Sequence, residues 1–131
     1  HELKNKIDVI KEYDDIPHIH CYPNQLNQVF LNLFVNAAQA ITDKGYIKIK
    51  LFTEKQYLCI QISDSGSGIP DENLKKIFDP GFTTKGVGVG SGLGLAISYN
   101  IIKKHNGTIS VNSEVGKGTT FIISLPIEQI L

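Results

Sequence analysis

The stretch NQLNQVFLNLFVNAAQAI, from Asn24 to Ile41, has the clearest helical pattern in the chain. Its apolar residues recur at intervals of three and four, the spacing of one side of an α-helix. Pro23 suits the first turn because the missing N–H would have no partner there, and Lys44-Gly45 ends the pattern. The number of apolar positions predicts a helix that is buried over most of its circumference.

One narrow ridge of this predicted helix is polar. It consists of amides at helical spacing with one carboxylate at the end: Gln25, Gln28, Asn32, Asn36, Gln39 and Asp43. Buried amides need hydrogen-bond partners, so one interpretation is an amide network against another element. The other is the floor of a wet cavity, in which the amide oxygens of Asn32 and Asn36 would suit Mg²⁺.

Two predicted strands place a polar residue on their apolar side. In YLCIQISD, Asp64 has the same parity as the three apolar residues before it, and in TTFIISL Thr119 shares the apolar parity. A buried carboxylate is costly unless it is paired, whereas an Asp before Ser-Gly often serves a turn. If the two strands are neighbours, Asp64 and Thr119 share a polar pocket within an apolar cleft, which is typical of ligand sites.

A glycine-rich stretch, GVGVGSGLGL, runs from Gly86 to Leu95. It fits neither the Walker A pattern nor the dinucleotide fingerprint, and a flexible surface loop is the plain alternative. A helix predicted to begin at Leu93 would place free N–H groups here, and these attract anions. Lys85 stands just before the loop. The stretch therefore predicts a phosphate cradle and a lid, with N–H groups from Ser91, Gly92 and Leu93.

The remaining pattern predicts an α+β two-layer sandwich, with two or three helices on one face of a largely antiparallel sheet. The predicted strands cover Ile7–Tyr13, His18–Tyr22, Tyr46–Thr53, Tyr57–Asp64, Thr108–Asn112 and Thr119–Leu125. Besides the first helix, a short one is expected over Glu72–Phe78 and a long one over Leu93–Lys104.

Length and composition narrow the class of protein. The 131 residues suffice for one domain, and the 13 basic residues balance the 13 acidic ones, which argues against a nucleic-acid partner. Apolar runs are too short to span a bilayer and no signal-peptide pattern opens the chain, so we expect a cytoplasmic domain. Cys21 and Cys59 form no C-x-x-C and are expected to be reduced thiols. Because HELK opens the chain without Met, residues 1–131 are expected to be one domain of a longer protein, either soluble or membrane-anchored.

Five segments in this order resemble the catalytic, ATP-binding domain of sensor histidine kinases. This domain belongs to the superfamily of the gyrase B-type, heat-shock-chaperone and mismatch-repair ATPases. The resemblance runs from about Asn24 to Pro126. The segments resemble the N, G1, F and G2 boxes and the final glycine-threonine segment, and they read NQVFLNLFVNAAQAI, DSGSGIP, IFDPGFTTK, GSGLGLAIS and GKGTTFIISLP.

The resemblance implies a mixed five-stranded sheet packed on about three helices, with a glycine-rich ATP lid. It implies that Asn36 ligates Mg²⁺, that Asn32 lies beside the metal and phosphates, and that Asp64 accepts the adenine amino group. Thr119 would act behind Asp64 through a water. The adenine wall would be Gly66, Gly68 and Ile69; the base of the lid would include Phe82, Thr83, Thr84 and Lys85; the phosphates would meet Gly90, Ser91, Gly92, Leu93, Gly94 and Leu95.

Three positions bear on how far this resemblance extends. Gln39 stands where many members carry a basic residue that meets phosphate, so Lys85, Mg²⁺ and backbone N–H groups would carry more of that charge. Gly81 replaces the second aromatic of the F box, and Phe82 follows it. Asn32 stands where hydrolysing relatives carry a Glu as general base. An amide cannot take a proton near neutral pH, which favours phosphoryl transfer to a histidine over hydrolysis.

The expected function is therefore to bind MgATP and donate the γ-phosphate to a histidine on a separate dimerisation domain, with a response regulator downstream. A hydrolysing ATPase and a non-enzymatic nucleotide-sensing domain are the alternatives. His1 of HELK is not the expected acceptor, because no two-helix hairpin fits around it. His18 and His20 lack a third metal ligand, and His105 suits a helix C-terminus. The isolated domain is expected to be monomeric.

Overall fold

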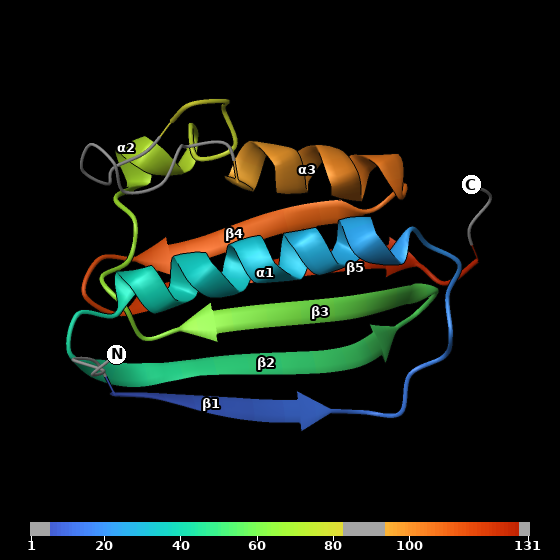
Figure 1. The fold of residues 1–131 in the computed structure, drawn as a ribbon, viewed down its shortest axis with the longest axis horizontal. Coiled ribbons are helices and arrows are strands. Elements are labelled where there is room, and N and C mark those ends of the chain that lie inside the picture. Colours follow the sequence, from blue (N-terminus) through green and yellow to red (C-terminus); the bar gives the residue numbers. More distant parts are fainter. Residues whose placement is uncertain (1–5, 83–93, 129–131) are drawn as a thin grey trace.

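Five strands form one sheet, and helices cover one of its faces (Figure 1). This computed structural model describes residues 6–82 and 94–128. In chain order the elements are β1 (Lys6–Tyr13), α1 (Pro23–Ala40), β2 (Lys44–Glu54), β3 (Tyr57–Asp64), α2 (Asp71–Leu74), α3 (Gly94–Lys104), β4 (Thr108–Glu114) and β5 (Gly118–Pro126).

The strand order is β1-β2-β3-β5-β4, with β1 and β2 parallel and the other neighbours antiparallel. The parallel pair is joined through α1, since parallel strands need a long crossover connection. The expected α+β sandwich, with a mixed and largely antiparallel five-stranded sheet packed on three helices, is confirmed.

The core lies between the helices and the sheet. Helix α1 buries one side, with Val29 and Leu33 almost fully enclosed, against sheet residues that include Ile123 and Leu125. Fully burying an aliphatic side chain of this size is worth about 1.5–3 kcal/mol. Contrary to the prediction from its composition, the helix is not buried around most of its circumference, because the described elements that pack on it, the sheet and α3, cover one side. Its outer side is exposed, most clearly at Leu31 (62%).

Two expected elements are wrong. Residues His18–Tyr22 form no strand: β1 is the edge of the sheet, and the chain leaves it to reach α1. The backbone N–H of Tyr22 donates instead to Nε2 of His105, at 3.0 Å. The short helix expected over Glu72–Phe78 covers only Asp71–Leu74, because the following N–H groups bond to carbonyls three residues back in tighter turns.

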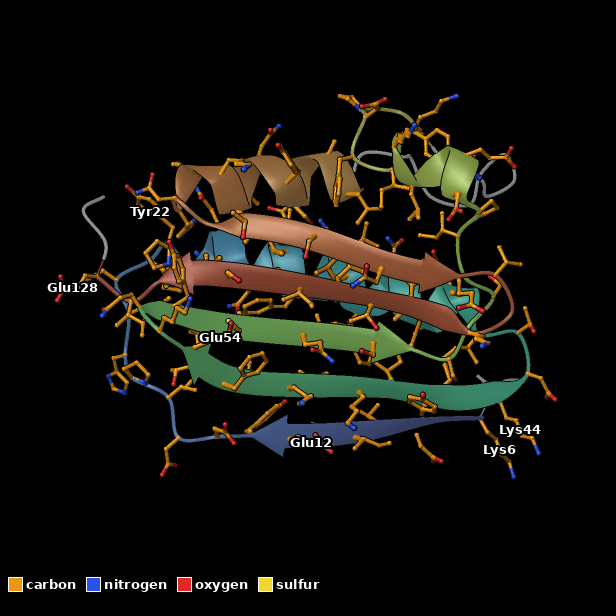
Figure 2. All side chains as sticks on the ribbon, turned by 180° about the vertical axis from the view of Figure 1, so that it is seen from behind. Lys6, Glu12, Tyr22, Lys44, Glu54 and Glu128 are labelled. Carbon is orange, nitrogen blue, oxygen red and sulfur yellow. The ribbon has the colours of Figure 1, made fainter. Side chains whose placement is uncertain are left out.

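The other face of the sheet is not covered by the described helices (Figure 2). Its side chains pair with one another: Lys48 lies 3.2 Å from Glu12, and Ser63 hydrogen-bonds Thr120 at 2.9 Å. Both cysteines are free thiols, as expected, with Cys59 buried and Cys21 half-buried. In the described ranges, the helices are too short or too polar to cross a membrane.

Candidate functional site

Asp64 and Thr119 meet at one end of the sheet. They are direct partners in the register of β3 and β5, and their side chains are 8% and 5% exposed. The strand parity therefore predicted both inward-facing side chains and their shared location. The turn interpretation of Asp64 also holds, because its Oδ1 accepts the N–H of Gly66 at 2.8 Å. The carboxylate is buried and part of a turn at once.

Burial raises the pKa of Asp64 above its ordinary value of 3.8, and the N–H groups of Gly66 and Thr119 oppose that rise. Within residues 6–82 and 94–128, the ion pairs join Lys48 to Glu12 and Lys117 to Glu114, so neither neutralises Asp64. A buried acceptor of this kind, without an ion-pair partner among the described residues, favours a ligand that brings its own hydrogen-bond donor.

Ser113 completes a cluster of hydroxyl groups beside Thr119. Its Oγ lies 2.8 Å from Thr119 Oγ1 and 2.7 Å from the N–H of Ile69, and it donates to the carbonyl of Gly118 at 3.0 Å. Ser113 was not among the site residues predicted from the sequence. The signal was present, since Ser113 has the parity of the inward-facing Ile109 on the same strand.

The segment after Asp64 is fixed between α1 and the hairpin of β4 and β5. The N–H of Ser67 donates to Ala40 at 3.0 Å, and the carbonyl of Ser67 accepts from Gly116 at 2.9 Å. A Cβ on Gly66 would lie 2.6 Å from the Ala40 oxygen, and Gly68 has a φ of +77° against the backbone of Glu114. Both glycines are thus needed for close backbone packing, whatever they do for a ligand.

The amides of α1 divide into two groups. Asn32 Nδ2 donates to the carbonyl of Gly94 at 3.1 Å and to Ser98 Oγ at 3.3 Å, so part of the expected amide network exists against α3. Asn36 lies one turn further along and is also half-buried, whereas Gln28 and Gln39 are exposed. The polar ridge is therefore half-buried at Asn32 and Asn36, on the side of α1 that faces α3.

Aromatic packing holds the segment that follows α2. Phe78 lies 5.4 Å from Tyr99 and 6.4 Å from Phe121, measured between ring centroids. Phe82 is half-buried against the core, as are Ile69 and Leu95. Gly81, which replaces an expected aromatic, has a φ of +83° with open space around it, so its backbone conformation accounts for glycine there.

These parts gather at one end of the molecule, where β3 and α1 end and where β5 and α3 begin (Figure 1). Of the expected site residues, the structure describes Asn32, Asn36, Gln39, Asp64, Gly66, Gly68, Ile69, Phe82, Gly94, Leu95 and Thr119. The others, Thr83, Thr84, Lys85, Gly90, Ser91, Gly92 and Leu93, lie outside the described residues.

An apolar hollow of about 410 Å³ lies on the other side of α1, between that helix and the strands β1 to β3. Its lining is apolar or aromatic: Tyr13, Phe30, Leu31, Phe34, Ile49, Leu51, Ile60 and Ile62. Ligand sites need a few convergent polar groups to orient the ligand. The Asp64 end of the sheet supplies such groups, and this hollow does not.

The side chains available as ligands also limit which metal ion this domain could bind. The described part of the chain has no group of three His, Cys, Asp or Glu side chains that could hold an ion, so His18 and His20 gain no third ligand there. Mg²⁺ takes oxygen ligands, keeps several waters and is often bound through substrate phosphates, and the amide side chains of α1 carry oxygens of this kind.

Similarity to known proteins agrees with this geometry. A family model described as "Histidine kinase-, DNA gyrase B-, and HSP90-like ATPase" matches residues 21–129. Sporulation kinase E of Bacillus subtilis is 46% identical over 118 residues, which cover 88% of this chain and 16% of that protein. The chain spans less than a quarter of the length of these curated relatives, for example 24% of the sensor histidine kinase ZraS of Escherichia coli.

Solved structures give the same result. The catalytic domain of histidine kinase ThkA superposes with a TM-score of 0.82 at 35% identity, covering 93% of this chain and 80% of that one. The sequence resemblance, the five-stranded fold and the family match are mutually consistent over nearly all the described residues. The chain therefore belongs to the family of histidine kinase-, DNA gyrase B- and HSP90-like ATPases.

Proposed function

We propose that residues 1–131 form a catalytic domain that binds MgATP and donates its γ-phosphate to a histidine on a separate dimerisation domain. The family membership supports nucleotide binding, and relatives named sporulation kinase and sensor histidine kinase support phosphoryl transfer in two-component signalling. A response regulator would then receive the phosphate. The residues of the site have the following proposed roles.

The adenine base is proposed to bind at the Asp64 end of the sheet. Adenine carries an exocyclic amino group, which donates hydrogen bonds, and Asp64 is a buried acceptor that lacks an ion-pair partner among the described residues. Thr119 lies directly opposite and adds a hydroxyl. Gly66, Gly68 and Ile69 would form the wall of the pocket, since their backbone is held close to the sheet and to α1.

The phosphates and the metal are proposed to lie along the middle of α1, near the start of α3. Asn36 would ligate Mg²⁺, and Asn32 would lie beside it. When bound, Mg²⁺ supplies charge neutralisation for the phosphates during transfer. Gly94 and Leu95 would meet the phosphates at the first turn of α3, together with Lys85, Thr83, Thr84, Phe82 and the loop residues Gly90, Ser91, Gly92 and Leu93. Gln39 would lie at the rim and contribute no charge.

The observation that favours transfer over hydrolysis is the position of Asn32. Its Nδ2 is committed to the Gly94 carbonyl and to Ser98, so the amide is held with its nitrogen against α3. A neutral amide held in this way cannot remove a proton from water. Transfer to a histidine needs no such base, because phosphoryl transfer depends mainly on positioning and electrostatic stabilisation.

The test uses the full-length protein that contains this chain. After incubation with γ-labelled ATP and Mg²⁺, the label should become protein-bound, stable in base and labile in acid, as expected for phosphohistidine. Asn36→Ala should abolish labelling. Labelling that is stable in acid, or release of inorganic phosphate without labelling, would contradict the proposal in favour of another acceptor or of the hydrolysing alternative. Absence of ATP binding would favour a non-catalytic domain.

The oligomeric state and the cellular location of the domain are also part of the proposed function. We propose that the isolated domain is a cytoplasmic monomer that pairs only through the dimerisation domain. Its balanced charge of 13 basic and 13 acidic residues supports the absence of a nucleic-acid partner. Light scattering at micromolar concentration should give the mass of one chain, 14.5 kDa, and a mass twice as large would contradict the monomer.

A further inference from the structure

The hydroxyl of Ser113 has three hydrogen-bond partners. The N–H of Ile69 approaches it at 2.7 Å and can only donate. The carbonyl of Gly118, at 3.0 Å, can only accept. Thr119 Oγ1, at 2.8 Å, can do either. A serine hydroxyl has one proton to donate and two lone pairs that accept, so these three contacts fill its capacity.

The direction of the bond to Thr119 follows from this count. Ser113 uses its only proton for the Gly118 carbonyl, since that contact admits no other donor. Its two lone pairs then accept from Ile69 and from Thr119. Thr119 must therefore donate its own proton to Ser113, and its hydroxyl can offer only lone pairs to anything else.

We propose that Ser113 is a positioning residue that sets the base selectivity of the site by fixing the proton of Thr119. The inference rests on the proposed function, in which the base meets Asp64, and it places the Thr119 hydroxyl directly against the same base edge in place of the expected contact through a water. With the proton of Thr119 turned toward β4, the carboxylate of Asp64 and the hydroxyl of its register partner Thr119 both act as acceptors toward the base. Both groups accept, so a base edge that carries donors is favoured.

The two purine types differ at the atom concerned. Adenine has an amino group at position 6, which donates two hydrogen bonds, whereas hypoxanthine and guanine have an oxygen there, which only accepts. An oxygen placed against two acceptors leaves buried polar groups unpaired, and sites built to bond a donor reject analogues that lack it. Ser113 thus keeps the pocket from adapting, because a free Thr119 hydroxyl would rotate to donate to such an oxygen.

Ser113 also ties Ile69 to the sheet, so its removal has a structural effect that must be separated from selectivity. A structural effect weakens the binding of all purine nucleotides alike. The proposed effect changes the ratio of the dissociation constants of inosine and adenosine diphosphates (IDP and ADP), which differ in the base edge and share the ribose and phosphates. The ratio is therefore the readout.

The experiment measures ADP and IDP binding by calorimetry for wild type, Ser113→Ala, Ser113→Thr and Thr119→Val. Ser113→Ala should lower the IDP/ADP ratio about three- to tenfold, the scale of one neutral hydrogen bond. Ser113→Thr keeps a hydroxyl on the strand and should retain the wild-type ratio. In a Thr119→Val background, Ser113→Ala should have no further effect on the ratio, because the residue through which it acts is absent.

An unchanged ratio in Ser113→Ala would overturn the inference. If that variant does not fold, Thr119→Val alone decides: the inference requires a lower ratio than in wild type, and an unaltered ratio overturns it. Failure of the wild-type protein to bind ADP would instead refute the proposed function, so the two failures are distinct.

Discussion

Asp64 and Thr119 are direct partners across the antiparallel strands β3 and β5, and both side chains are buried. The carboxylate accepts hydrogen bonds from the backbone, from the N–H of Gly66 at 2.8 Å and from that of Thr119. Burying an ionised group with so little compensation costs folding free energy. The cost in folding free energy of burying Asp64 is consistent with the proposed role of this pair in binding a ligand.

Asp64→Asn should stabilise the nucleotide-free protein at neutral pH, by roughly 1 kcal/mol, the usual scale of a single substitution. Burial raises the pKa of Asp64, so its ionised form destabilises the fold. Asparagine removes the charge and keeps an oxygen for the N–H of Gly66. Urea denaturation measures the difference in free energy of unfolding, and a less stable variant would contradict the account.

The same carboxyl predicts a sign for the pH dependence of stability. Since the folded pKa of Asp64 is raised above 3.8, the folded protein holds this proton more tightly than the unfolded chain. The resulting stabilisation is complete below the ordinary pKa and is lost as pH rises through the raised folded pKa. The advantage of Asp64→Asn over wild type should therefore grow across that window. A constant difference across it would show that Asp64 does not titrate as described.

Asn32→Ala should destabilise the protein by about 1–3 kcal/mol, because it removes the two hydrogen bonds that its side chain makes to α3 and leaves the Gly94 carbonyl with one partner fewer. Gln28→Ala is the matched control, since it removes an exposed amide from the same helix. That control should stay within about 0.5 kcal/mol of wild type. Equal denaturation midpoints for the two variants would mean that the Asn32 contacts do not join the helices.

Gly68→Ala should cost more than Gly81→Ala. Both glycines have a positive φ, of +77° and +83°, so both variants incur the left-handed strain of about 1–2 kcal/mol. Only at Gly68 would the new Cβ also overlap the backbone of Glu114, with its carbonyl carbon 2.7 Å away. The difference between the two unfolding free energies isolates the overlap, and a difference near zero would show that the loop moves freely.

His105 should act as a structural group with a fixed tautomer. It is fully buried: Nδ1 lies 2.8 Å from the carbonyl of Ile101 and so carries the proton, and Nε2 accepts the N–H of Tyr22. His105→Ala should cost about 2–4 kcal/mol from a cavity and unpaired polar groups, whereas His20→Ala, at an exposed site, should cost under about 0.5 kcal/mol. Nitrogen NMR of the imidazole checks the tautomer, and a proton on Nε2 would contradict the hydrogen bond to Tyr22.

Local periodicity accounts for the parts of the fold that could be predicted. Alternation along β3 and β5 placed Asp64 and Thr119 inside, and helical spacing located α1 to within a residue at each end. These signals are local and repeat over many residues. The same parity applied to β4 would have identified Ser113 as an inward hydroxyl.

The errors arose where tertiary context decides. Residues 18–22 have strand-like composition, but the sheet edge beside them is already β1, and their backbone bonds to His105. The exposed side of α1, with Leu31 and Val35, shows that apolar composition did not reveal how many neighbours the helix has. Likewise, Ser98 is fully buried against Asn32, a pairing of residues 66 positions apart that no local pattern contains.

The most direct test of the account is calorimetric titration of the protein with ADP and Mg²⁺, beside a GDP control and the Asp64→Asn variant. Wild type is expected to bind ADP, GDP is expected to give no binding heat, and Asp64→Asn is expected to lose most of the ADP heat although it is at least as stable as wild type. Equal binding of ADP by wild type and Asp64→Asn would contradict the placement of the base at Asp64 and Thr119.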